Sequence, residues 1–180
     1  MMDEQEKLRQ LEDYMADSDK KWRGLPTFIR ESNQIEGEDT DGERLEREVP
    51  AYGEFLHLPE LAVSDLVKFV SVVKPGNRLR VAAGMDVRVG DHVAPFGGPE
   101  IVAHLMGLLS AINGRKLTAY AAHHEYETLH PFTDGNGRSG RVVWLWMHKN
   151  QTRGGAYERA IIRGFLLQWY YESLHFGRNP

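Results

Sequence analysis

The stretch His130-Pro131-Phe132-Thr133-Asp134-Gly135-Asn136-Gly137-Arg138-Ser139-Gly140-Arg141 places a histidine, a carboxylate, glycines and two arginines close together in the chain. The preceding segment 116–129 contains neither Gly nor Pro, which favours a helix. After the stretch, apolar residues recur at helical spacing, at Val142, Leu145 and Trp146. The sequence therefore predicts a tight loop that leads from one helix into the next.

A loop of this kind is suited to binding an anion. Gly135 and Gly137 let the backbone turn freely and approach a ligand closely. The N–H groups at the start of the next helix then point at one spot, as in phosphate-binding loops. Arg138 and Arg141 are three positions apart, so on a helix they share a face near that spot. Their guanidinium groups are expected to hold the outer phosphates of a nucleoside triphosphate.

Two further side chains of the stretch can take part in chemistry. Asp134 precedes the glycines and offers hard oxygen ligands where Mg²⁺ would bridge phosphate oxygens. His130 is a candidate general base, because neutral imidazole has a reference pKa of about 6.5 and can accept a proton from an attacking hydroxyl near neutral pH. We therefore interpret 130–141 as an active site.

The whole stretch resembles the motif of Fic-domain proteins, H-x-F-x-[DE]-G-N-G-R-x-x-R, and every defined position is matched. The resemblance implies an enzyme that moves a nucleoside monophosphate, usually AMP from ATP, onto a protein hydroxyl. The Doc-like branch, which phosphorylates its targets, typically has Lys where Gly137 stands. This chain therefore looks like the AMP-transferring branch.

The resemblance also gives each matched position a role. His130 would be the general base, Phe132 an anchor that packs under the loop, and Asp134 the Mg²⁺ ligand. The other positions would bind phosphate: Gly135, Asn136 and Gly137 as an anion nest to which the Asn136 side chain contributes, Arg138 at the β- and γ-phosphates, and Arg141 at the γ-phosphate.

A second motif lies far upstream, at Ser32-Asn33-Gln34-Ile35-Glu36-Gly37. It fits [ST]-x-x-x-E-[GN] and resembles the inhibitory-helix motif of Fic proteins. We expect an inhibitory helix over 26–37, because Pro26 suits the first position of a helix and Gly37 suits a left-handed C-terminal cap. Ser32 and Glu36 are four positions apart and are expected to share one face of this helix.

The composition limits the classes of protein that the chain can belong to. Its 180 residues, 41% hydrophobic and 27% charged, suffice for one core, so we expect a single Fic-like domain over 1–180. Lys and Arg number 22 against 26 Asp and Glu, a net charge of −4, which argues against a nucleic-acid partner. There is no Cys and no apolar run near the roughly 20 residues of a membrane span. We expect a cytoplasmic protein with no membrane partner.

The rest of the chain predicts an all-α helical bundle with one small β-hairpin. Segment 38–48 is acidic and is expected to be a solvated connection that enters a helix starting near Pro50. Helical patterns or start signals also occur up to Ala16, from Pro59 to Lys74, and over 101–112, 117–129 and 157–175.

The segment 77–99 has a different character. Two short β-favouring pieces, 87–89 and 92–94, are joined by Gly90-Asp91, a hairpin turn signal. The Fic resemblance implies a flap hairpin over 84–97 that holds an extended segment of the target protein by main-chain hydrogen bonds. ATP and a target protein docked on this flap are therefore the expected partners.

Several alternatives remain open at the level of sequence. The same site could remove AMP, with Glu36 orienting a water, or could use another nucleotide, because no residue that reads the base is identifiable. A non-enzymatic alternative is a nucleotide-sensing binding module, although the intact His130 argues against it. The target protein and the state of homo-oligomerisation are also open. We expect the chain to be mostly inactive as encoded, because Glu36 should occupy the guanidinium group of Arg141.

Overall fold

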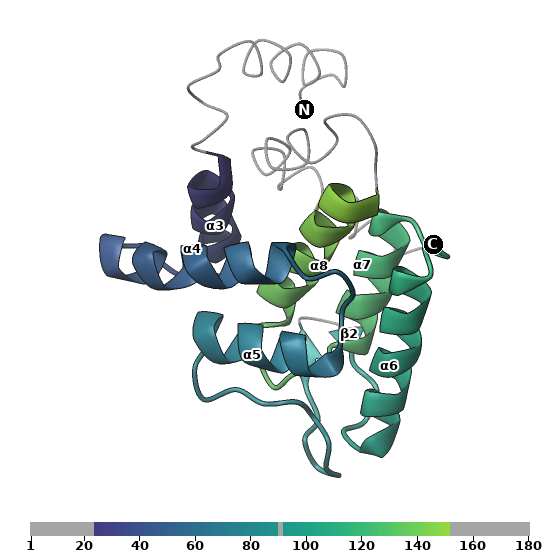
Figure 1. Ribbon diagram of the computed structural model, residues 1–180. Coiled ribbons are helices and arrows are strands. Elements are labelled where there is room, and N and C mark those ends of the chain that lie inside the picture. Colours follow the sequence, from purple (N-terminus) through teal and green to yellow (C-terminus); the bar gives the residue numbers. More distant parts are fainter. Residues whose placement is uncertain (1–23, 90–91, 152–180) are drawn as a thin grey trace, which may run out of the picture. The chain divides into compact units, whose positions relative to one another are not determined.

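The computed structural model describes residues 24–89 and 92–151, and these residues form mainly helices, as predicted (Figure 1). The helices are α3 (Gly24–Ile35), α4 (Gly42–Leu56), α5 (Val63–Val73), α6 (Pro99–Asn113), α7 (Ala119–Leu129) and α8 (Asn136–Gln151). The helices expected before Ala16 and over 157–175 lie outside the described residues. In the part of the chain that is described, no helix has the length and apolar character needed to cross a membrane.

The described residues belong to two compact units, one that ends at Val49 and one that comprises Pro50–Gln151. The expectation of one domain over 1–180 stays a prediction.

In the first unit, α3 ends where the sequence predicts its end. Gly37 has a φ of +71°, the left-handed conformation that glycine adopts most easily. Its N–H donates to the carbonyl of Gln34 at 3.0 Å, and the N–H of Glu38 donates to the carbonyl of Asn33 at 3.1 Å. This pair of bonds is a Schellman cap. Ser32 is buried within the helix, and Glu36 directly follows the last helical residue.

The prediction for the start of α4 is wrong. The helix begins at Gly42, and Pro50 lies inside it. Asp41 caps the helix, because its carboxylate accepts the N–H of Arg44 at 2.7 Å. Pro50 cannot donate to the carbonyl of Glu46, yet the interruption is tolerated because these two residues are exposed and water can reach that carbonyl.

The segment predicted to be a solvated connection also contains a buried carboxylate. Glu48 is 0% exposed and accepts hydrogen bonds from Asn33 Nδ2 at 2.7 Å and from Arg44 Nε at 2.8 Å. Arg44 also pairs with Glu38 across 2.5 Å. Burial lowers the pKa of the Arg44 guanidinium, but the hydrogen bonds and charges of Glu48 and Glu38 outweigh it, so the pKa rises overall. This network joins α3 to the first turns of α4.

The half-buried carboxyl of Glu31 should make the stability of the first unit depend on pH. Burial raises the pKa of the Glu31 carboxyl to about 7, from an ordinary value of 4.5. Between these two values the folded state binds a proton that the unfolded chain has lost, so this group makes folding less favourable as pH rises toward 7. We expect Glu31→Gln to melt at a higher temperature than the wild type at pH 8. The difference should shrink as pH falls toward 4.5, and melting curves that run parallel at all pH values would contradict this assignment.

In the second unit, the end of α4 and helices α5, α6, α7 and α8 enclose one apolar core (Figure 1). The ring of Phe69 contacts the rings of Tyr52 and Phe55, with centroids 4.9 and 5.4 Å apart. Helix α8 packs against α5 and α7, and α6 also packs against α5 and α7. The buried apolar side chains of these four helices include Leu66, Val70, Ile101, Leu105, Ile112, Tyr126, Val142, Val143 and Leu145.

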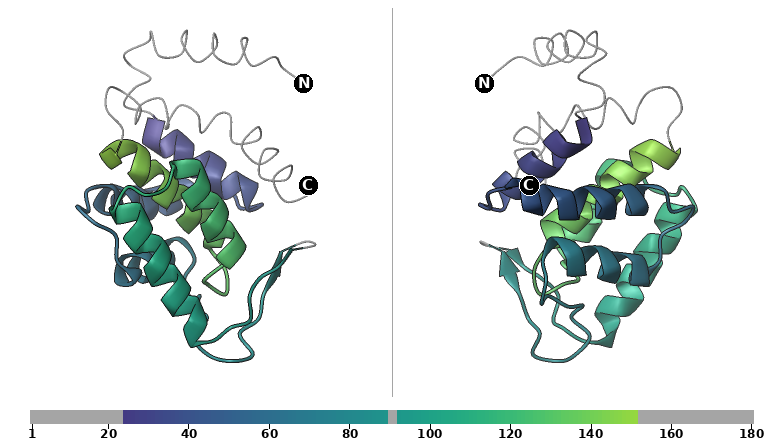
Figure 2. Two further views of the ribbon diagram at one scale, coloured as in Figure 1. Left: turned by 90° about the vertical axis from the view of Figure 1, so that its right-hand side faces the viewer. Right: turned by 60° about the vertical axis from the view of Figure 1, so that its left-hand side comes forward.

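Between α5 and α6 the chain forms two arms that extend away from the helices, the first arm over 74–89 and the second arm over 92–98 (Figure 2). Their ends carry the short strands β1 (Arg88–Val89) and β2 (His92–Val93), which pair antiparallel. This pair is shorter than predicted, and a developed flap sheet is not seen. The predicted turn at Gly90-Asp91 lies outside the described residues, and the role of a flap stays a prediction.

Candidate active site

His130 lies at the end of α7 in a left-handed conformation, with φ 49° and ψ 62°. This conformation is uncommon for a residue with a side chain and costs on the order of 1–3 kcal/mol. The ring Nδ1 lies 3.2 Å from the backbone carbonyl oxygen of Glu127. A carbonyl only accepts hydrogen bonds, so Nδ1 carries the hydrogen of the neutral ring. Nε2 is then the basic nitrogen.

The loop after His130 is held by a side chain of the motif itself. The Asn136 amide accepts from the N–H of Phe132 and donates to the carbonyl of the same residue, each at 2.8 Å. Phe132 is 0% exposed and forms a β-bridge with Leu79. Phe132 therefore lies where an anchor would lie. Asn136 therefore closes the loop through its two hydrogen bonds to the backbone of Phe132. Its contact with phosphate stays a prediction.

Asp134 is partly accessible to solvent, with 48% of its side chain exposed. One carboxylate oxygen accepts the N–H of Gly135 at 2.5 Å, and the other lies 3.4 Å from Lys74 Nζ. Gly135 has a φ of +82°, which a side chain would strain. Among the described residues, no three His, Asp or Glu side chains gather as a metal site. A single accessible carboxylate nevertheless fits Mg²⁺, which usually binds one or two carboxylates together with substrate phosphates.

The two arginines of the motif lie in the first turns of α8. The side chains of Arg138 and Arg141 are 0% and 1% exposed. Arg138 Nη1 donates to the carbonyl of Val73 at 3.0 Å, at the end of α5. Its guanidinium therefore satisfies a carbonyl at a helix C-terminus, where positive charge is favourable. The predicted phosphate contacts of the two arginines are not tested by this arrangement.

A residue that the sequence analysis did not single out organises the site. Arg80 is 0% exposed, and its guanidinium donates to four backbone carbonyls. Two belong to the end of α7, His130 at 2.7 Å and Leu129 at 2.8 Å. The other two belong to the arms, Pro95 at 2.8 Å and Met85 at 3.2 Å. Arg80 thus connects the candidate base to both arms.

Burial lowers the pKa of the Arg80 guanidinium, and the negative charge of Asp86 partly offsets this effect. An arginine stays charged at neutral pH even so. A charge-assisted hydrogen bond therefore holds the carbonyl of His130 in place.

Ser139, an undefined position of the motif, is also part of the site. Its hydroxyl donates to the carbonyl of Gly135 at 2.8 Å and accepts from the Tyr126 hydroxyl at 2.8 Å. Burial raises the pKa of Tyr126, although its hydrogen bond to Ser139 acts in the opposite direction. Tyr126 therefore stays neutral and links α7 to the loop. The sequence contained no signal for this pair, because its two members lie on different helices.

The motif loop, the first turns of α8 and the segment from Arg80 thus meet in one place within a single unit. Residues 80–148 match the model of the Fic/DOC family. The match supports a Fic-domain protein, and we call residues 80–148 the Fic segment. It begins at Arg80 and includes all of 130–141. No curated protein matches the chain.

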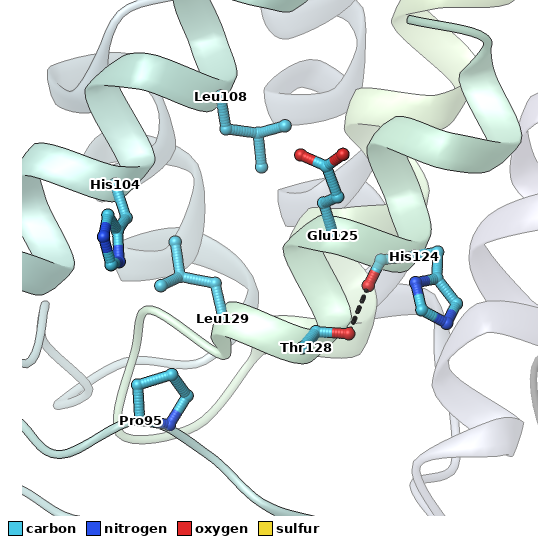
Figure 3. A pocket seen from close by; sticks show the side chains of 7 residues that line it. All are labelled: Pro95, His104, Leu108, His124, Glu125, Thr128 and Leu129. Atoms are coloured by element: carbon cyan, nitrogen blue, oxygen red, sulfur yellow. Dashed lines mark hydrogen bonds between the residues drawn. The ribbon is translucent and has the colours of Figure 1, made fainter. Parts of the chain in front are cut away.

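A groove of about 320 Å³ also lies within the Fic segment (Figure 3). Side chains from α6, α7 and the second arm line it: Pro95, His104, Leu108, His124, Glu125, Thr128 and Leu129. None of the residues 130–141 lines this groove. We therefore do not assign the nucleotide to it.

Proposed function

We propose that this chain is an autoinhibited protein adenylyltransferase, which transfers AMP from ATP to a Ser, Thr or Tyr hydroxyl of a target protein. The observation that carries the proposal is the orientation of His130, whose ring is fixed through Nδ1 so that Nε2 can accept a proton. The match of the Fic segment to its family supports nucleotide transfer in general. Gly137 favours AMP transfer over phosphorylation, because the phosphorylating branch typically carries Lys there.

In the proposed reaction, the target hydroxyl oxygen attacks the α-phosphorus of ATP and forms a new P–O bond. The bond from the α-phosphorus to the oxygen that bridges to the β-phosphate breaks, and pyrophosphate leaves. The hydroxyl proton passes to Nε2 of His130. The first N–H groups of α8, including that of Gly137, would point at the phosphates, and Gly135 provides the turn that leads into this helix.

Asp134 would hold Mg²⁺ in this site. When bound, the ion neutralises charge on the phosphate oxygens and helps to orient them. Lys74, which lies 3.4 Å from Asp134, is close enough to exchange this partner for a phosphate oxygen.

The direct test is incubation of the purified protein with Mg²⁺ and ATP, alone and with a cell lysate, followed by mass spectrometry. We expect an added AMP on this protein or on a lysate protein. ATP that binds without any adduct would instead indicate a binding module. Parallel incubations with labelled GTP, CTP and UTP identify the preferred base, and loss of AMP from a pre-modified substrate would reveal the reverse activity.

The proposed autoinhibition predicts that Glu36→Gly is more active than the wild type. If Glu36 occupies the guanidinium of Arg141, the γ-phosphate cannot dock there and the α-phosphorus is misplaced. A misplacement of about 1 Å can cost on the order of 10²-fold in rate, so release should raise AMP transfer by one to two orders of magnitude. Melting should change little, because Glu36 lies after the last residue of α3.

Asp39→Gly is the matched control for this variant, because it removes an exposed carboxylate from the same connection. It should leave the rate of AMP transfer unchanged. If Glu36→Gly is no more active than the wild type while His130 and Arg141 prove essential, the upstream motif is a chance match.

A further inference from the structure

The inference concerns Glu127, a residue of α7 that neither motif includes, and it rests on the proposed function. We infer that Glu127 is the positioning residue of His130: its carboxylate fixes the ring and compensates the charge that the ring acquires during transfer. The Glu127 carboxylate lies between two histidines. Oε2 is 3.9 Å from His130 Nδ1, and Oε1 is 3.7 Å from His123 Nε2. Glu127 and His123 are 8% and 1% exposed.

Glu127 offers Nδ1 of His130 two acceptors at once. The backbone carbonyl of Glu127 lies at 3.2 Å and its carboxylate at 3.9 Å from the same nitrogen. A small rotation of the ring would redirect the hydrogen bond of Nδ1–H from the carbonyl to the carboxylate, and the hydrogen would stay on Nδ1. Catalytic hydrogen bonds are often long without substrate and tighten in the reacting complex. Either acceptor leaves Nε2 as the basic nitrogen.

Helix α8, which packs against α7, leaves space for the Glu127 carboxylate because Gly140 has no side chain. A Cβ atom added to Gly140 of α8 would lie 2.4 Å from Glu127 Oε1 and 3.1 Å from His123 Cε1. No side chain fits there unless the carboxylate moves. A carboxylate is costly to bury unless it is paired, so a slot of this kind argues for a function of the charge. His123 faces the other oxygen, with its Nε2 3.7 Å from Oε1.

The negative charge of Glu127 offsets the positive charge that Arg80 places close to His130. The Arg80 guanidinium donates to the carbonyl of His130 at 2.7 Å, so a positive charge already lies beside the base. When Nε2 takes the proton of the target hydroxyl, the ring becomes a second positive charge in a site where only 14% of its side chain is exposed. In the inferred role, the Glu127 carboxylate attracts the imidazolium without taking its proton, and Nδ1 keeps its hydrogen.

The test is Glu127→Gln, which keeps the size of the side chain and an acceptor oxygen but removes the charge. We expect kcat for AMP transfer to fall about 10- to 100-fold, whereas KM for ATP should change little, because an effect confined to the transition state lowers kcat alone. The acidic limb of the pH–rate profile should move to lower pH by roughly one unit, because the imidazolium loses its partner.

Glu125→Gln is the matched control. Glu125 lies on the same helix but is exposed and lines the groove of Figure 3, so its replacement should leave kcat and the pH profile unchanged. A Glu127→Gln protein with wild-type kcat and pH profile would overturn the inference. A variant that loses thermal stability and activity together, with an unmoved pH profile, would also overturn it and indicate a structural role.

A second readout does not depend on AMP transfer. NMR titration of the His130 ring measures the pKa of the base directly, and we expect this pKa to fall by roughly one unit in Glu127→Gln. If the wild type shows no AMP transfer but the titration moves as expected, the proposed function fails and the pairing of Glu127 with His130 stands. If transfer is observed but the titration does not move, the pairing fails and the proposed function stands.

Discussion

Replacement of His130 by Ala should lower the rate of AMP transfer by about 10²–10⁴-fold, the range that a well-placed general base typically contributes. The target hydroxyl would then have no side chain to take its proton. Binding of ATP should be nearly unchanged, because the proposed phosphate contacts come from the backbone at Gly135 and Gly137 and from the arginines of α8. A labelled-ATP assay gives the rate, and calorimetry with ATP and Mg²⁺ gives the affinity.

The backbone at His130 requires a second variant. Its φ of 49° is more easily adopted by Asn than by Ala, so His130→Asn separates loss of the base from strain in the loop. The two variants should be equally inactive, and Asn should melt closer to the wild type. His124→Ala, on the same helix but lining the groove, is the control and should keep its activity. Transfer at the wild-type rate by either His130 variant would disprove its role as the base.

The sequence predicted those parts of the structure that local chemistry determines. The glycines, arginines and flanking apolar residues of 130–141 identified the loop and the two helices around it, because their conformational and helical preferences act over a few residues. Gly37 identified the end of α3 for the same reason, since a left-handed cap strongly favours glycine. The helix pair α6 and α7 followed from long periodic segments.

Features that depend on contacts between distant segments were not predicted. Pro50 was interpreted as a helix start, although the cap at Asp41 and the exposed carbonyl of Glu46 let α4 pass through it. The acidic segment that contains Glu48 looked solvated, because a buried carboxylate is recognisable only once Asn33 and Arg44 are placed beside it. The contact of Glu36 with Arg141, and the role of Ser32 in it, stay predictions.

Arg80 is the most important residue of the site that could not be predicted from the sequence. An arginine is normally exposed, and nothing within a few residues of Arg80 marks it as buried. Its partners are carbonyl oxygens, which every residue possesses, so no complementary residue type in the sequence indicates the contact. Only the fold brings the end of α7 and the arms to the same guanidinium.

Replacement of Arg80 by Met should therefore be among the most destabilising single changes in the Fic segment. Met fills much of the same volume, but the four carbonyls of Met85, Pro95, Leu129 and His130 lose their donor. Hydrogen bonds to a charged group contribute about 1.5–3 kcal/mol each and are not additive, so we expect a loss of about 3–5 kcal/mol of unfolding free energy. For a protein of this size, this corresponds to a melting temperature lower by roughly 6–20 °C.

Two further variants make the measurement specific to this contact. Arg78→Met removes an exposed arginine two positions earlier and should melt within about 2 °C of the wild type, as expected for a surface substitution. Arg80→Lys keeps the charge but has a single ammonium in place of the planar fork, so it cannot reach all four carbonyls and should be intermediate in stability. Where Arg80→Lys still folds, its AMP transfer should fall more than its melting temperature suggests, because the carbonyl of His130 is no longer held by the guanidinium. An Arg80→Met protein that melts with the Arg78→Met control would show that water replaces the guanidinium at these carbonyls and that Arg80 does not hold the site together.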